Sequence, residues 1–109
     1  LAKCHAKLEA MKLLNWRMAT AVANNTLTPS DASASKVFGV ETQIEVYRIF
    51  LGILGTAGYL SAGSPGAVLR GEVERAGRSA QINTFGGGVV EVLREIVATV
   101  GLQMTRSSR

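Results

Sequence analysis

The strongest constraint on the fold is the helical spacing of apolar residues in two long stretches, separated by the sequence NNTLTPSD at residues 24–31. Across residues 1–23 apolar side chains recur every three or four positions, and a similar spacing runs from Val37 to Leu54. A repeat near 3.6 residues places such side chains on one face of a helix. We therefore expect two long helices, with Trp16 and the methionines of the first one in the core.

The break between the two stretches carries the signals of a helix start. Thr28 is expected to cap the second helix, with Pro29 at its first position and Asp31 in its first turn. A side-chain oxygen at the cap accepts from free amides, and a carboxylate favours the positive helix end. The second helix is therefore expected to begin at Pro29.

A narrower polar face remains on the second stretch. It carries charges of both signs, namely Lys36, Glu41, Glu45 and Arg48. Because side chains three or four positions apart are neighbours on a helix, we expect Glu41 and Glu45 to pair with Arg48 or its neighbours. This face is interpreted as solvated or as an interface.

The second half of the chain is punctuated by glycine. We expect a loop at 55–66, a third helix at 65–80 capped by Ser64, extended chain at 81–85, and a last helix at 89–100. Gly101 is expected to stop that helix, and residues 103–109 are expected to fray. Because no strand pattern or repeat competes, the sequence predicts an all-α fold, an antiparallel bundle of three to four helices.

Composition limits the function classes. A chain of 109 residues with 47% hydrophobic and 18% charged residues is expected to form one globular domain, and no apolar run approaches the length of a membrane span. The net charge of +4 comes partly from Arg106 and Arg109, without basic clusters interleaved with aromatic residues, so we expect no nucleic-acid partner. Cys4 and His5 have no companions for a disulfide or a metal site.

The amino-terminal segment mixes Lys and Glu among its apolar residues, which is not the pattern of a signal peptide. We expect a cytoplasmic protein. The chain begins without Met and inside an expected helix, so we expect a fragment of a longer polypeptide.

Three consecutive glycines, residues 86–88, stand directly before the last expected helix. Glycine lets a ligand approach the backbone, and the first amides of a helix are free donors. Two interpretations stay open, a cradle for part of a phosphate-bearing cofactor or substrate, and a close-packed turn. The stretch is neither GxGxxG nor GxxxxGK[ST], so the usual nucleotide-binding motifs do not apply.

Two segments together carry a family resemblance: KVFGVETQIEVYRIFLGILGTAGYL at 36–60 and LRGEVERAGRSAQINTFGGGVVEVLREIVATVGL at 69–102. They resemble the carboxyl-terminal helical domain of the acyl-CoA dehydrogenases, especially the actinobacterial branch with a closing motif like TFGGGxNEVQRDIIA. The resemblance implies a four-helix bundle that follows a helical domain and a β domain, with FAD as cofactor. Residues 1–109 would then be a partial C-terminal domain that lacks both earlier domains and the first bundle helix.

The resemblance also implies where the site lies and how this chain departs from it. Many family members have the catalytic glutamate where this chain has Gly87, and Val89 replaces a threonine that donates to the flavin. Glu91 is the nearest carboxylate and points elsewhere on its helix. Because other members carry the glutamate on the first bundle helix, no catalytic residue is expected within this chain.

A second family motif, QxxGGxG, corresponds to residues 52–58, where Gly52 replaces the glutamine. In the family this motif contacts FAD across a subunit interface. Since polar side chains have been lost, any binding would rest on the backbone. The expected FAD-binding residues are Gly86, Gly87, Gly88, Val89, Glu91, Gly55 and Thr56.

Three hypotheses follow. The resemblance implies the C-terminal segment of an FAD-dependent acyl-CoA dehydrogenase, an oxidoreductase that desaturates acyl-CoA thioesters in lipid or steroid side-chain catabolism and assembles as a homo- or hetero-oligomer. The segment alone is expected to be inactive. The alternative is a non-catalytic partner subunit with a degenerate site. The third is a free-standing helical interaction module in which the glycines serve a tight turn.

Overall fold

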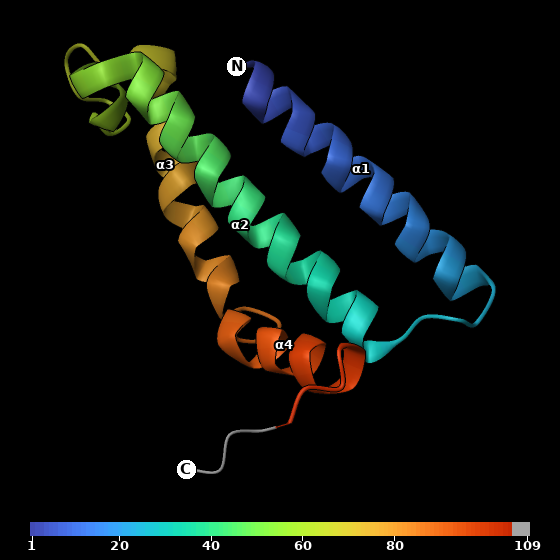
Figure 1. Cartoon of the computed structure of the whole chain (residues 1–109). Coiled ribbons are helices and arrows are strands. Elements are labelled where there is room, and N and C mark those ends of the chain that lie inside the picture. Colours follow the sequence, from blue (N-terminus) through green and yellow to red (C-terminus); the bar gives the residue numbers. More distant parts are fainter. Residues whose placement is uncertain (106–109) are drawn as a thin grey trace.

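The computed structural model describes residues 1–105, and within them four α-helices and no strand are found (Figure 1). The α-helices are α1 (Ala2–Ala23), α2 (Pro29–Leu54), α3 (Glu72–Ala80) and α4 (Val90–Ile96). Shorter helical segments follow or precede them: η1 (Gly55–Tyr59), η2 (Val68–Gly71), η3 (Gln81–Thr84) and η4 (Val97–Gly101). The predicted all-α fold is confirmed.

The central element is α2. It lies between α1 on one side and α3 on the other, and α4 packs near its amino-terminal end (Figure 1). The radius of gyration is 17.2 Å, whereas a compact domain of this length has a radius of about 13 Å. The bundle is therefore open, with α1 packed chiefly on α2.

The start of α2 forms as its sequence predicts. The Thr28 hydroxyl oxygen accepts from the Asp31 amide at 3.1 Å and donates to the Asp31 carboxylate at 2.6 Å. Pro29 is the first helical residue, where its missing amide hydrogen costs nothing. Arg17 of α1 also reaches Asp31, at 3.2 Å, so the cap region is joined to both long helices.

The core lies between α2, α3 and α4. Its buried members are Val40, Ile44, Ala80 and Val90. From α1 only Cys4 is buried among the described residues. The expectation that Trp16 lies in the core is wrong, because this side chain is 63% exposed. The reason is that, among the described elements, α1 packs chiefly on α2, which covers one side of it.

The third helix begins later than its sequence predicts. It starts at Glu72, because Leu69 and Arg70 adopt left-handed conformations that interrupt the helix. Gly71 follows with φ 71°, and a Cβ there would lie 2.5 Å from the Ala62 nitrogen. Ser64 belongs to a turn, where its amide donates to the Ser61 carbonyl.

The end of the chain also differs in part from the prediction. Residues 81–85 are not extended, since Gln81 continues the helical conformation of α3 into η3. The last helix begins at Val90, one residue later than expected, and continues as the wider turn η4 to Gly101. Of the stretch that is expected to fray, residues 106–109 lie outside the described residues. The charges of Arg106 and Arg109 therefore lie outside them as well.

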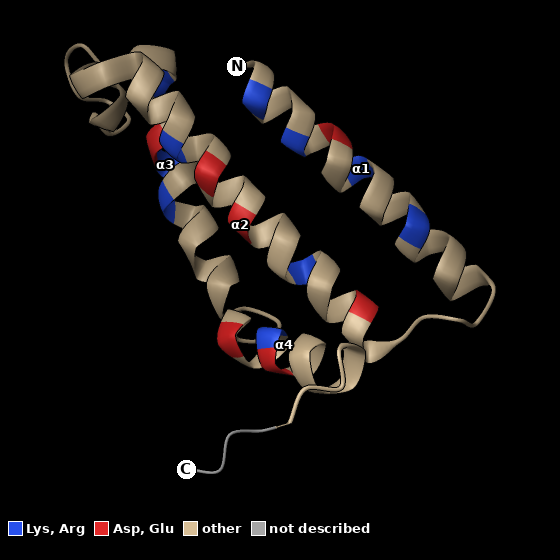
Figure 2. Cartoon of the chain, viewed as in Figure 1, with Lys and Arg blue, Asp and Glu red and all other residues tan. Residues whose placement is uncertain are grey.

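The charges of α2 pair with other helices instead of with Arg48. Basic residues recur along α1 and carboxylates along α2 (Figure 2). Glu45 is held by Lys3 and Lys7, each at 2.6 Å, and Glu41 by Arg94 of α4. The polar face of α2 therefore serves as an interface within the chain.

Within the part of the chain that the structure describes, no helix is both long and apolar enough to cross a membrane.

Candidate functional site

The glycine turn, residues 85–89, joins η3 to α4. The Gly86 amide donates to the Ile82 carbonyl at 2.9 Å and the Gly88 amide to the Phe85 carbonyl at 3.3 Å. Gly87 has φ 74° and Gly88 has φ 118°. Residues with a Cβ rarely adopt such angles, so the local geometry itself requires glycine at both positions.

The turn leaves backbone donors free. The amides of Gly87 and Val89 have no hydrogen-bond acceptor among the described residues. Val89 precedes α4 as its N-cap, and its carbonyl accepts from the Leu93 amide at 3.0 Å. Because unpaired amides are strong donors, the turn offers hydrogen bonds to a ligand through its main chain.

Two contacts from α2 hold this region in place. Lys36 Nζ donates to the Gly86 carbonyl at 2.9 Å. About two turns further along α2, Gln43 Oε1 accepts from Asn83 Nδ2 at 3.1 Å. Sequence reasoning missed both contacts, since the partners are 50 and 40 residues apart and no local pattern connects them.

Glu91 lies in the first turn of α4, where a carboxylate favours the positive helix end. It lines a shallow groove of about 440 Å³ with Arg48 and Arg94. Its position is therefore explained by helix electrostatics. Within residues 1–105, no group of three or more His, Cys, Asp and Glu residues is placed so that it could hold a metal ion.

Gly55 and Thr56 lie at the opposite end of α2. Gly55 ends this helix with φ 61°. The 19 positions between Lys36 and Gly55 correspond to about 28 Å along a helix. The structure thus divides the seven expected binding residues into two groups, one at the glycine turn and one at η1.

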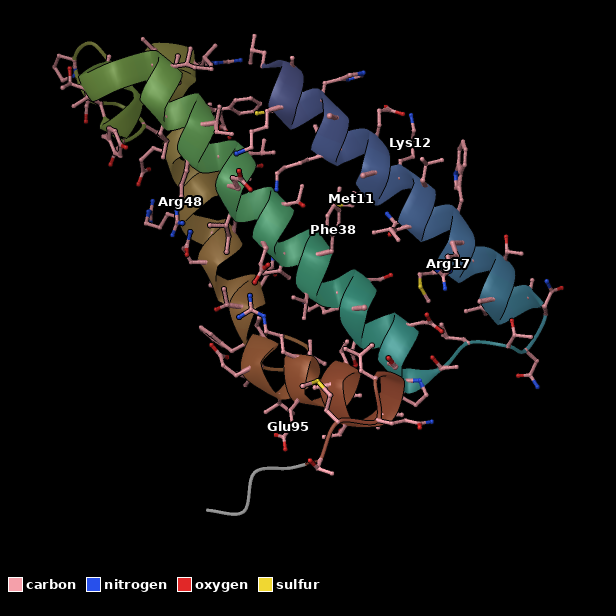
Figure 3. The ribbon with its side chains drawn as sticks, viewed as in Figure 1. Met11, Lys12, Arg17, Phe38, Arg48 and Glu95 are labelled. Atoms are coloured by element: carbon pink, nitrogen blue, oxygen red, sulfur yellow. The ribbon has the colours of Figure 1, made fainter. Side chains whose placement is uncertain are left out.

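A groove of about 580 Å³ runs between α1 and α2. Its walls are apolar, with Leu8 and Met11 from α1, whereas Lys36, Gln43 and Asn83 give it a polar end. Figure 3 shows Met11 pointing from α1 toward α2. The residues that anchor the glycine turn therefore also form one end of this groove.

The fold and the site together define a helical-bundle domain. Its glycine turn, before the last helix, offers backbone hydrogen-bond donors in place of reactive side chains. The family model described as the acyl-CoA dehydrogenase C-terminal domain matches residues 1–102. The chain belongs to the acyl-CoA dehydrogenase family. The predicted family membership is confirmed.

Two curated relatives come from Mycobacterium tuberculosis. The chain is 48% identical to acyl-CoA dehydrogenase FadE26 over its whole length and 38% identical to acyl-CoA dehydrogenase FadE29 over 90% of its length. It spans 28% and 24% of these relatives, respectively.

Solved structures give the same fold. The Tcur3481-Tcur3483 steroid ACAD is 57% identical with a TM-score of 0.90, over 97% of this chain and 28% of that one. The ChsE4-ChsE5 complex from Mycobacterium tuberculosis is 49% identical with a TM-score of 0.86, over 97% of this chain and 27% of that one. The all-helical bundle is therefore that of the family's C-terminal domain.

Proposed function

We propose that this chain is the C-terminal bundle segment of an FAD-dependent acyl-CoA dehydrogenase that desaturates acyl-CoA thioesters in lipid or steroid side-chain catabolism. The observation that carries the proposal is the family match over residues 1–102, which runs through the glycine turn. The similarity to a protein named as a steroid ACAD favours a steroid-derived acyl group. The helical and β domains of the family, and the first bundle helix, would belong to the remainder of the polypeptide.

The glycine turn fits part of a flavin nucleotide. It is exposed, it lacks side chains at residues 86–88, and its Gly87 and Val89 amides are free to donate. When bound, FAD would supply the hydride acceptor for the β-carbon of the acyl chain. Gly55 and Thr56 lie too far along α2 to share one end of a cofactor with the turn, so they would contact a nucleotide held mainly by another subunit.

The alternative is a non-catalytic partner subunit. Two observations favour it: Gly87 has no side chain that could accept a proton, and the similar solved structures are named as pairs of proteins. In this case the chain would complete an interface while the base and most of the flavin site reside in the other subunit.

Flavin stoichiometry separates the two functions. The full-length protein that carries this sequence would be purified alone and together with the products of adjacent genes, and bound flavin measured by its visible absorbance. One flavin per subunit in the protein alone, with dehydrogenation of a steroid side-chain acyl-CoA, supports the enzyme. Flavin and activity that need a second subunit support the partner function, and a flavin-free, inactive protein in every combination contradicts both.

A further inference from the structure

We propose that Lys36 is a positioning residue, which fixes the direction of the Gly87 amide toward the cofactor. This inference rests on the proposed function, because it assigns the glycine turn to a flavin nucleotide. Lys36 acts through its hydrogen bond to the turn and does not itself need to reach the ligand.

The contact comes from a rigid element. Lys36 lies in the first half of α2, and its Nζ donates to the Gly86 carbonyl at 2.9 Å. The ammonium group also lies close to Gly87, since a Cβ built there would be 3.9 Å from Nζ. A charged donor makes a stronger hydrogen bond than a neutral one, so the Gly86 carbonyl is held toward α2.

The direction of one carbonyl determines the direction of the next amide. In a trans peptide the C=O and the following N–H point to opposite sides, and no cis peptide is found within residues 1–105. With the Gly86 carbonyl turned toward Lys36, the Gly87 N–H points away from α2. This is the free donor described above.

The hydrogen bonds of the Gly86 and Gly88 amides flank that peptide plane, and among the described residues only Lys36 makes a hydrogen bond to the peptide group between Gly86 and Gly87. Glycine occupies both sides of it, and glycine populates positive and negative φ with similar ease. Without the lysine, the plane between Gly86 and Gly87 can rotate, and the amide then loses its direction. Gln43 and Asn83 hold the preceding η3 segment, so they do not replace the contact to Gly86.

Lys36→Met tests the inference, because it removes the donor and keeps an unbranched side chain. Lys36→Arg keeps a charged donor. Lys12→Met is the matched control, since Lys12 pairs with Glu9 within α1 and lies on the side of α1 away from α2 (Figure 3). Each variant of the full-length protein, with its partner subunit if one is required, would be titrated with FAD while flavin fluorescence and the visible spectrum are followed.

We expect Lys36→Met to weaken FAD binding by roughly three- to tenfold, the size of one typical hydrogen bond, because Lys36 acts on the ligand only through the turn. Lys36→Arg should restore most of the affinity and the flavin spectrum, and Lys12→Met should match the unmodified protein. Hydrogen exchange of the cofactor-free protein should show faster exchange at residues 86–88 for Lys36→Met alone. If that variant does not fold, Lys36→Gln, which is too short to make the contact, replaces it with the same expectations.

The outcomes are distinguishable. Unchanged FAD affinity in Lys36→Met, in a protein that binds FAD, overturns the role of Lys36 and leaves the proposed function intact. A Lys36→Arg variant as weak as Lys36→Met overturns the hydrogen bond as the cause. Absence of FAD binding in the unmodified protein overturns the proposed function, and this inference with it.

Discussion

At the scale of single residues, the glycine turn is set by backbone angles. Gly88 has φ 118°, and a Cβ there would lie 3.2 Å from a Leu93 methyl carbon. Gly52, by contrast, lies inside α2 with open space around its Cα. The two glycines therefore differ in role. The backbone geometry requires Gly88, whereas Gly52 weakens a helix and has no structural explanation in this chain.

Gly88→Ala should lower the free energy of unfolding by roughly 1–3 kcal/mol, because it forces a residue with a Cβ into a sparsely populated conformation. Gly52→Ala is the matched control and should raise the free energy of unfolding by about 0.5–1 kcal/mol. Urea unfolding followed by circular dichroism measures both. Equal stability in the two variants would contradict the geometry of the turn.

At the scale of elements, α2 organises the chain because its start is capped and its charges reach two other helices. The cap of Thr28 satisfies an amide that the helix leaves free. Farther along, Glu45 is bound by Lys3 and Lys7 of α1, and Glu41 by Arg94 of α4. These ion pairs orient α1 and α4 on α2. They add little to the free energy of unfolding, since exposed pairs contribute little.

Thr28→Ala should destabilise the protein by about 1 kcal/mol, because it leaves the Asp31 amide without its acceptor. Thr28→Ser keeps the hydroxyl and should retain most of the stability. Thermal unfolding of both variants at neutral pH decides the question. A serine variant as unstable as the alanine variant would show that the methyl group of Thr28 matters and the cap does not.

Through Glu45, the stabilisation of α1 against α2 depends on pH. Hydrogen bonds from Lys3 and Lys7 lower the pKa of Glu45 from its usual 4.5 to about 2. A lowered pKa in the folded state means that this carboxylate stabilises the fold above pH 4.5, and that the contribution is lost as the pH falls from 4.5 toward 2.

Glu45→Gln should therefore unfold at a lower temperature than the unmodified chain at pH 7, and the difference should shrink as the pH approaches 2. Glu9→Gln is the comparison and should show a smaller difference, because a single lysine, Lys12, makes the hydrogen bond that lowers the pKa of Glu9 and the pair lies within one helix. Calorimetry across pH 2–7 provides the comparison. A difference for Glu45→Gln that stays constant with pH would rule out the ion pair as its source.

At the scale of the whole molecule, the open bundle exposes apolar surface along α1. Leu13 and Trp16, three positions apart on one side of α1, are each about three-fifths exposed. An exposed apolar face of this kind is typical of a surface that another chain or segment covers. In the full-length protein this face is a candidate for contact with the rest of the bundle.

The isolated 109-residue chain should self-associate as its concentration rises, since burial of that face is favourable. Trp16→Glu should shift the distribution toward monomer. Tyr59→Glu, at a side chain that is also 63% exposed but lies on η1, should not. Light scattering across a concentration series measures all three, and a monodisperse monomer of the unmodified chain would contradict the expectation.

Much of the fold follows from local chemistry. The bounds of α1 and α2, the cap at Thr28 and the glycine turn rest on interactions within about four residues, which a sequence displays directly. The family resemblance was likewise visible in the order of the segments. The late start of α3 was not visible in the sequence, because it depends on the close approach of Gly71 to the Ala62 backbone.

By itself, then, the sequence determined the all-helical class and the two long helices, whereas the need for glycine at residues 87 and 88 came from the backbone angles of the folded turn. Tertiary structure alone decided that Trp16 is exposed, that Glu41 and Glu45 pair with α4 and α1, and that Lys36 holds the Gly86 carbonyl. The physical reason is sequence separation. Backbone angles and caps act between near neighbours, whereas burial and ion pairing depend on which distant surfaces packing brings together.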